Sequence, residues 1–279
     1  MMQYSNFELK LNIIVCAVIV MLLLFILKTV IKYFLNKKTL QITERIIIGQ
    51  EEIQEDNVKI VTKENETLAI VSDGFGFNEA GKAASNICVN TIGRMFKNEE
   101  INERYHYFIK KSFNKTNHEV LTRIEEGKGG ASVTAAIINK NKLYYGLVGD
   151  VMLAVFRKSE LVRISEGHTM DEIAKKEYYQ GHISKEDAVC TINNKKVLYY
   201  FGKEPFDHIE FCNVPITLYK NDIVVIMTRG IYENIRWIDL EKILKKGKSN
   251  IEEACNEIIE NTSQMKNGSI VLIKYCSSK

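Results

Sequence analysis

The sequence predicts an α+β domain, an antiparallel β-sandwich flanked by helices (αββα), preceded by one transmembrane helix. The chain has 279 residues, 46% of them apolar and 26% charged, an ordinary globular composition. Many short β-rich runs are interspersed with a few helical patterns, without the regular alternation that a doubly wound parallel sheet requires. A long apolar run near the N-terminus supplies the predicted membrane segment.

The apolar run predicts a membrane anchor. It is unbroken over residues 13–27, and a helix from Leu11 to Ile31 would rise about 32 Å, roughly the thickness of a bilayer's hydrocarbon core. A secretory signal peptide is the competing interpretation, but no small-residue cleavage site follows the run. A buried core helix is the other alternative, although no cap or polar face is evident.

Flanking charges predict the orientation. Lys28, Lys32, Lys37 and Lys38 follow the span, whereas Lys10 alone precedes it. Positive residues are retained on the cytoplasmic side, so we expect a single-pass protein of the cell membrane with a cytoplasmic C-terminal domain. The scattered cysteines, which contain no CxxC pair, favour buried thiols in a reducing compartment over disulfides.

These considerations divide the chain into three parts. We expect a short extracytoplasmic N-terminus over residues 1–10, a transmembrane helix with its juxtamembrane segment over 11–36, and a folded domain over 41–279. The net charge of +3 gives no reason to expect a nucleic-acid partner.

The strands of the domain are predicted from β-rich runs and turn signals. The runs lie at residues 58–62, 68–72, 132–138, 143–148, 152–156, 197–201, 209–214, 223–228 and 270–274. Helical spacing of apolar residues predicts a helix of about 17 residues beginning near Ala80 and another around 251–259, and a further helix is expected within 100–124.

One segment carries a motif with chemical meaning. Residues 70–74 read Ile-Val-Ser-Asp-Gly, a strand that ends in Asp73-Gly74-Phe-Gly76 before an Ala/Ser-rich helix. DGxG alone is weak evidence, because turns use the same residues. Further segments follow in a characteristic order: Gly130–Ile137, Leu147–Asp150, Leu161–His168, Gly181–Ala188 with Leu198–Gly202, Asn221–Asn234 and Lys266–Val271.

In this order the motifs resemble those of PP2C-like (PPM-type) serine/threonine phosphatases, over about residues 45–275. The resemblance implies a PP2C-like sandwich and a centre of two Mn²⁺ or Mg²⁺ ions, hard cations that prefer oxygen ligands. By this resemblance Asp73 bridges both ions, the Gly74 carbonyl is a ligand, and Glu55 completes the second site through water. Asp56 belongs to the same Glu-Asp pair, and Asp150 matches an acidic residue associated with a third ion.

The resemblance fails at three positions that carry the chemistry. Arg229 stands where the family has an Asp ligand of the first metal, and Lys266 replaces the other Asp of that metal. Glu51 falls where the family has a phosphate-binding Arg. Asp222 is expected to be a turn residue and not a substitute ligand, and His168 a packed structural residue.

Replacing two ligand carboxylates by Arg229 and Lys266 changes the local charge by four units. An ion a few ångströms from Arg229 and Lys266 would meet repulsion on the order of several kcal/mol, even at an effective dielectric of about 20. We expect both cations to pair instead with Asp56 and Asp73. At most one Mn²⁺ or Mg²⁺ is expected at the residual site, and no catalytic residue is assigned.

The sequence therefore predicts a membrane-anchored pseudophosphatase, a regulatory or phosphoprotein-binding module whose partner is a phosphoprotein, a kinase or a membrane-complex protein. The alternative is an active Mn/Mg-dependent protein serine/threonine phosphatase with an atypical metal site. A one-metal enzyme that binds phosphate through Arg229, and a local misalignment of the motifs, also stay open.

Overall fold

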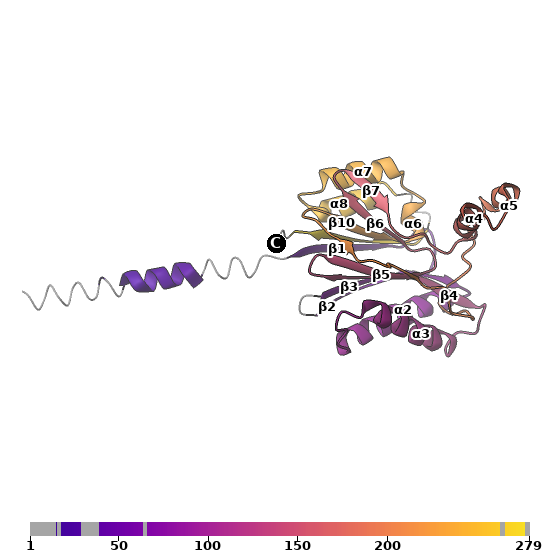
Figure 1. The fold of residues 1–279 in the computed structure, drawn as a ribbon, viewed down its shortest axis with the longest axis horizontal. Coiled ribbons are helices and arrows are strands. Elements are labelled where there is room, and N and C mark those ends of the chain that lie inside the picture. Colours follow the sequence, from indigo (N-terminus) through magenta and orange to yellow (C-terminus); the bar gives the residue numbers. More distant parts are fainter. Residues whose placement is uncertain (1–14, 16–17, 29–38, 64–65, 263–265, 277–279) are drawn as a thin grey trace, which may run out of the picture. The chain divides into compact units, whose positions relative to one another are not determined.

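The structure is a computed structural model that describes residues 15, 18–28, 39–63, 66–262 and 266–276. The chain divides into two compact units, 1–39 and 40–279. In the first unit residues 18–28 form an exposed helix, drawn in indigo in Figure 1. Among the described ranges, no helix combines the length and apolar character needed to cross a bilayer. Much of the anchor predicted over 11–36 lies outside the described residues.

The second unit is an αββα sandwich, as predicted (Figure 1). Sheet A has the strand order β1-β11-β10-β6-β7, and sheet B has the order β2-β3-β4-β5-β8, with β9 pairing with β5. All of the recorded strand pairs are antiparallel. The strands are β1 (Leu40–Ile47), β2 (Asn57–Lys63), β3 (Glu66–Gly76), β4 (Gly129–Asn139), β5 (Lys142–Val148), β6 (Met152–Arg157), β7 (Glu160–Arg163), β8 (Glu210–Phe211), β9 (Ile216–Thr217), β10 (Ile223–Met227) and β11 (Gly268–Tyr275).

Helices cover the outer face of each sheet. The helices are α2 (Ala80–Asn98), α3 (Tyr105–Leu121), α4 (Met170–Tyr179), α5 (Lys185–Thr191), α6 (Arg229–Tyr232), α7 (Trp237–Lys246) and α8 (Ile251–Glu260). Helices α2 and α3 lie on sheet B, and α7 and α8 lie on sheet A (Figure 1). The predicted helices near Ala80, within 100–124 and around 251–259 correspond to α2, α3 and α8.

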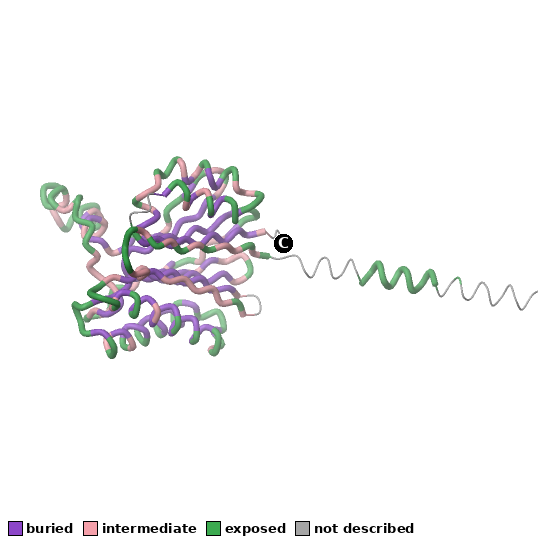
Figure 2. The backbone as a smooth tube through the Cα atoms, turned by 180° about the vertical axis from the view of Figure 1, so that it is seen from behind, coloured by how far each residue is buried: buried purple, intermediate pink, exposed green. Residues whose placement is uncertain are grey.

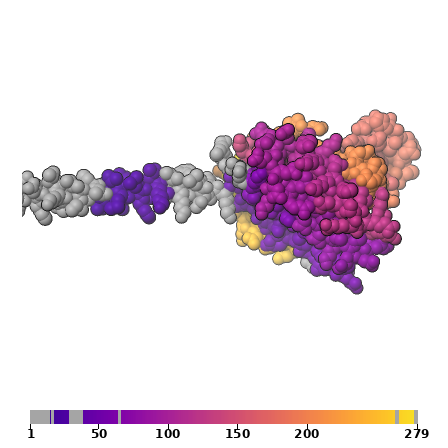
Figure 3. All heavy atoms as spheres, turned by 90° about the horizontal axis from the view of Figure 1, so that it is seen from below, coloured from indigo at the N-terminus to yellow at the C-terminus, as the bar shows by residue number. Residues whose placement is uncertain are grey.

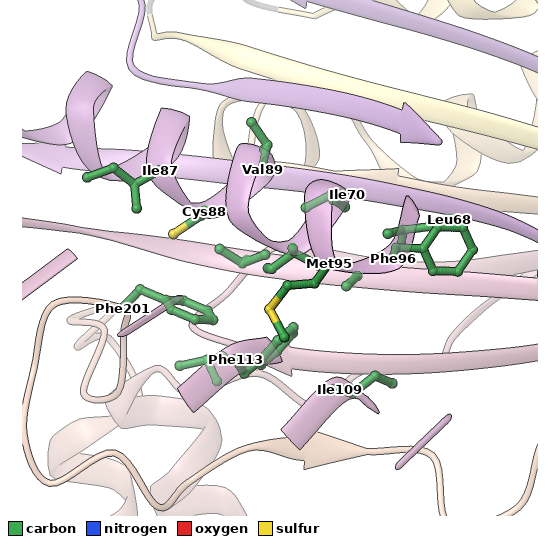
Figure 4. Packing of buried hydrophobic residues seen from close by; sticks show 14 of the residues in the cluster. Leu68, Ile70, Ile87, Cys88, Val89, Met95, Phe96, Ile109, Phe113 and Phe201 are labelled. Carbon is green, nitrogen blue, oxygen red and sulfur yellow. The ribbon is translucent and has the colours of Figure 1, made fainter. Parts of the chain in front are cut away.

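Successive apolar residues of a strand pack on opposite faces of its sheet, so the core consists of layers. On β3, Leu68 and Ile70 face α2 and α3, while Ala69 and Val71 face the other sheet. Successive side chains of a strand point to opposite faces, so a strand covered on both faces is apolar throughout. The buried strands form two central layers in Figure 2, and Figure 4 shows Phe96, Phe113 and Phe201 in the layer between sheet B and its helices.

One part of the chain projects from the sandwich. We call residues 169–197 the flap; it contains α4 and α5, and its ends meet in a bridge between Thr169 and Val197. It projects from the body in Figures 1 and 2, and again at the upper right of Figure 3. The strand predicted at 197–201 is absent: only isolated bridges form there, Val197 with Thr169 and Phe201 with Ala131.

Candidate functional site

The acidic residues of the motifs gather at one end of the sandwich, where strands of both sheets end. Asp73 is on β3 and pairs across the sheet with Ser132 of β4. Asp150 follows β5, and Thr228 and Arg229 follow β10. Sequence segments far apart in the chain therefore bring Asp56, Asp73, Asp150 and Arg229 into one region.

Two glycines allow the segments to approach. A Cβ on Gly74 would lie 2.2 Å from the Gly81 carbonyl oxygen and 2.6 Å from that of Glu55. A Cβ on Gly230 would lie 1.7 Å from the Asn267 carbonyl oxygen. Only glycine fits these positions, so the DGxG and the Arg-Gly motifs keep the backbone geometry of the site.

Arg229 pairs with Asp150. Its guanidinium Nη2 donates a short hydrogen bond to Asp150 Oδ2 and a second one, of 2.9 Å, to the carbonyl oxygen of Lys195 in the flap. Asp150 also accepts hydrogen bonds from Ser132 Oγ at 2.9 Å and Tyr232 Oη at 3.4 Å. We expected Arg229 to pair with Asp56 and Asp73, and this expectation is wrong. The guanidinium pairs with Asp150 instead, because the side chain extends toward β5 and the flap.

Asp56 is bound by hydroxyl groups and not by a cation. Thr228 Oγ1 and Ser269 Oγ donate hydrogen bonds of 2.8 and 2.7 Å to Asp56 Oδ2. Thr228 Oγ1 in turn accepts from the Ser269 backbone N–H at 2.9 Å. These contacts connect the entry to β2 with the ends of β10 and β11, a role that the Ser/Thr character of positions 228 and 269 could have indicated.

Lys266 lies outside this cluster. Its side chain is exposed, and it makes no hydrogen bond or ion pair with any residue that the structure describes. Its predicted pairing with Asp56 or Asp73 is therefore wrong, because the side chain points to solvent while the neighbouring Asn267 turns inward. Asn267 Nδ2 donates to the Ile53 carbonyl at 2.6 Å, and its backbone N–H donates to Glu51 Oε2 at 3.4 Å.

Burial and mutual repulsion raise the acid pKa values. Desolvation, followed by the carboxylates of Asp56 and Asp150, raises the pKa of Asp73 well above its usual range, although the charge and backbone N–H of Arg229 act in the opposite direction. Desolvation also raises the pKa of Asp56 to about 6, against the lowering effect of Ser269 and Thr228. Desolvation and the charge of Glu51 raise the pKa of Glu55 to about 6.

The donor set does not fit a two-metal centre. Asp150 Oδ2 is engaged by a guanidinium, and Asp56 Oδ2 by two hydroxyl donors. Within the described part of the chain, no group of three or more His, Cys, Asp or Glu side chains is arranged to hold a metal ion. Glu55 still lies beside Asp73 and Gly74. Gly74 packs against the carbonyl oxygens of Glu55 and Gly81, and the Glu55 carboxyl sits beside Gly81 at the start of α2.

Two further residues have the structural roles expected of them. Asp222 accepts hydrogen bonds from Arg157 and from the Tyr219 backbone, away from the site. His168 is half-buried, and its Nδ1 accepts from the Gly149 N–H at 3.1 Å. Burial lowers the pKa of His168 to about 4, so its ring is neutral at pH 7.

The fold and the motif positions define a phosphatase-like domain of the αββα class. A family model described as Protein phosphatase 2C matches residues 47–237, and the chain belongs to that family. Serine/threonine phosphatase Stp of Listeria welshimeri is 25% identical over 209 residues, which cover 72% of this chain and 81% of Stp. The Stp of Listeria monocytogenes serovar 1/2a is similar to the same extent.

Solved structures agree on the fold. The serine/threonine phosphatase of S. agalactiae is 18% identical, with a TM-score of 0.74 over 85% of this chain and 100% of that one. The catalytic domain of PstP, solved with two manganese ions, is 17% identical, with a TM-score of 0.65 over 85% of this chain and 99% of that one.

Proposed function

We propose that the chain is a PP2C-family domain that has lost two-metal hydrolysis and acts as a regulatory or phosphoprotein-binding module. The observation that carries this proposal is the ion pair between Arg229 and Asp150. It places a permanent cation inside the acidic cluster, at the position that resembles a ligand of the first metal. The partner in this proposal is a phosphoprotein, a kinase or a protein of a membrane complex.

Electrostatics supports the loss of the metal pair. Burial lowers the pKa of Arg229, but the Asp150 carboxylate and the hydrogen bonds outweigh it and hold the pKa above its usual value, so the guanidinium stays charged at any physiological pH. A divalent ion would have to displace this charge from Asp150 and the hydroxyl donors from Asp56. Without paired ions there is no shared water of lowered pKa to attack a phosphoryl group.

Glu51 also acts against hydrolysis, because it weakens the binding of a phosphate substrate. It is exposed and faces Asn267, at the position that resembles the family's phosphate-binding Arg. A carboxylate there repels a phosphate monoester instead of attracting it. Glu51 and Arg229 thus each reduce hydrolysis by a separate physical effect.

The test is hydrolysis of an aryl phosphate by the full-length protein with excess Mn²⁺, with Asp73→Ala as the control variant. The proposal expects no turnover above that of Asp73→Ala. Turnover at the rate of an Stp measured in parallel, abolished in Asp73→Ala, would overturn it.

An active serine/threonine phosphatase is the second candidate, and the Listeria relatives named as such favour it. Glu55, Asp73 and the Gly74 carbonyl would hold one Mn²⁺ or Mg²⁺ in this case, with Arg229 available to a phosphate group. The pKa of Glu55, raised to about 6, is compatible with metal binding because an ion nearby would favour the ionised form. The same assay decides between the two candidates.

The membrane anchor is a further part of the proposal. The apolar run over 13–27 and the lysines at 28, 32, 37 and 38 support a single span with the C-terminal domain in the cytoplasm. Fractionation tests it: the full-length protein should remain in the membrane pellet after a carbonate wash. Recovery in the supernatant would contradict the anchor.

A further inference from the structure

The flap is held at its base by polar contacts between its two ends. Asp171, whose side chain is fully buried, accepts hydrogen bonds from Thr169 Oγ1 and Lys195 Nζ, both at 2.6 Å. Backbone bonds run from Met170 N to the Lys196 carbonyl at 2.9 Å and from Asp171 N to the Asn194 carbonyl at 3.1 Å. The two ends of the flap therefore form one unit.

Arg229 joins this unit to the acidic cluster. Arg229 Nη2 donates both to Asp150, at the end of the sandwich, and to the Lys195 carbonyl, at the base of the flap. Asp150 is itself fixed by Ser132 on β4. A chain of contacts thus runs from sheet B through Asp150 and Arg229 into the flap.

The helices of the flap have little packing of their own. In α4 only Asp171 and Ala174 are buried, and in α5 no residue is. Tyr179, with 84% of its surface exposed, lies in solvent. Segments with few buried apolar contacts open at low free-energy cost, so the position of the flap depends on polar contacts. Besides those at its base, these are the ion pairs of α4 with the body, Glu172 with Arg163 and Lys176 with Glu166.

We propose that Arg229 is a positioning residue that fixes the base of the flap to the acidic cluster, so that this chain orders its flap with an internal cation. The substitution that removes a metal ligand then has a second effect, the tethering of the segment next to the site. The inference rests on the proposed function in one respect: Arg229 keeps its place only while no divalent ion displaces it from Asp150.

Hydrogen exchange of the full-length protein in metal-free buffer tests this inference. In Arg229→Ala we expect backbone amides of residues 186–198 to exchange about fivefold faster or more, because a hydrogen bond from a charged donor to the flap is lost. Peptides of α2 and α8, remote from the flap, should exchange as in the wild type.

Arg157→Ala is the matched control. Arg157 also joins a buried carboxylate to a backbone carbonyl, through Asp222 Oδ2 and the carbonyl of Thr217 in β9, both at 2.7 Å. Its removal should leave flap exchange unchanged. Equal acceleration of flap exchange in both variants would mean general destabilisation and would overturn the inference, as would unchanged flap exchange in Arg229→Ala.

A double variant covers the case in which Arg229→Ala does not fold. Arg229→Met with Asp150→Asn removes both charges together, preserves side-chain volume and keeps an acceptor for Ser132. The inference expects faster flap exchange here too, and wild-type exchange would refute it. Phosphatase turnover of the wild type is measured separately, so an active wild-type enzyme whose flap is released by Arg229→Ala would refute the proposed function and leave this inference standing.

Discussion

Asp56 and Ser269 are joined by a hydrogen bond of 2.7 Å that connects the start of β2 with β11. The bond crosses between the two sheets, because β2 belongs to sheet B and β11 to sheet A. The Asp56 carboxylate accepts hydrogen bonds from two hydroxyl groups, those of Ser269 and Thr228. These hydrogen bonds join the two sheets at the site.

Ser269→Ala should destabilise the protein by about 2 kcal/mol, because it removes a buried hydrogen bond to a charged acceptor. Chemical unfolding at pH 7 measures the change. Ser72→Ala is the matched control: its Oγ is buried without a hydrogen-bond partner among the described residues, so its loss should leave stability unchanged or slightly increased. Equal destabilisation by both substitutions would contradict the assigned role of Ser269.

Asp73→Asn should stabilise the metal-free protein at pH 7, by on the order of 1 kcal/mol. The pKa of Asp73 is raised in the folded state, so the unfolded chain releases this proton more readily and ionisation favours unfolding above the ordinary pKa. The gain should shrink as the pH falls toward the ordinary value of 3.8. Unfolding curves at pH 7 and pH 4 measure it.

Asp239→Asn is the control and should lower stability at pH 7, because hydrogen bonding by Arg236 lowers the pKa of Asp239 in the folded state. A loss of stability in Asp73→Asn at pH 7 would mean that the ionised carboxylate is compensated in the native state, as a bound cation would do.

His168→Asn should reduce the loss of folding stability that the protein shows as the pH falls from 6.5 to 4. The pKa of His168 is lowered to about 4 by burial, so between pH 6.5 and 4 the unfolded state binds more protons and stability falls as the pH falls. Asn removes this proton uptake and keeps an acceptor for Gly149. The variant should recover up to about 3 kcal/mol relative to the wild type at pH 4. Parallel profiles for the two proteins would contradict the buried neutral ring.

Gly230→Ala should destabilise the protein by about 3 kcal/mol or more, because the new Cβ would overlap the Asn267 carbonyl oxygen. Gly181→Ala is the comparison. Its φ of +79° carries strain of about 1 kcal/mol for alanine, but no atom lies within 4 Å of the new Cβ. Thermal unfolding of the two variants should separate steric overlap from backbone strain, and equal losses would mean that the Gly230 contact relaxes easily.

Arg229→Asp with Lys266→Asp should raise Mn²⁺ affinity at least about tenfold, which requires only 1.4 kcal/mol of the several expected from the charge change. Calorimetric titration measures it, and adding Glu51→Arg should strengthen phosphate binding. Because Lys266 is exposed, the single variant Arg229→Asp should give most of the gain. Unchanged affinity would mean that the backbone of the site, and not these side chains, prevents binding.

Strand alternation and the motif order predicted most of the sandwich, because residues such as Val224 and Val225 are apolar on both faces of a covered strand. They did not predict β1, whose residues are mostly only partly buried at the edge of sheet A, or the brief pairing of β7 and β9. The run at 197–201 has strand composition but only isolated partners. The periodicity of apolar residues indicates which positions are buried, whereas strand pairing depends on segments that are distant in the sequence.

The sequence predicted which residues form the site better than it predicted the contacts among them. The positions of Asp73, Asp150 and Arg229 follow from the motifs, but the sequence could not distinguish Asp150 from Asp73 as the partner of Arg229. That choice depends on where α6 begins and where the flap carbonyl of Lys195 lies. Lys266 was misplaced for a similar reason, since the inward position at that turn belongs to its neighbour Asn267.

The pairing of β1 with β11 has a practical consequence for anyone shortening this chain. Leu40 is opposite Tyr275 and Ile47 is opposite Gly268, so the first strand shields the whole length of the last one. A soluble fragment that starts after Ile47 would leave an apolar, unpaired border on β11 and would aggregate. Expression trials should therefore keep every residue from Leu40 onward.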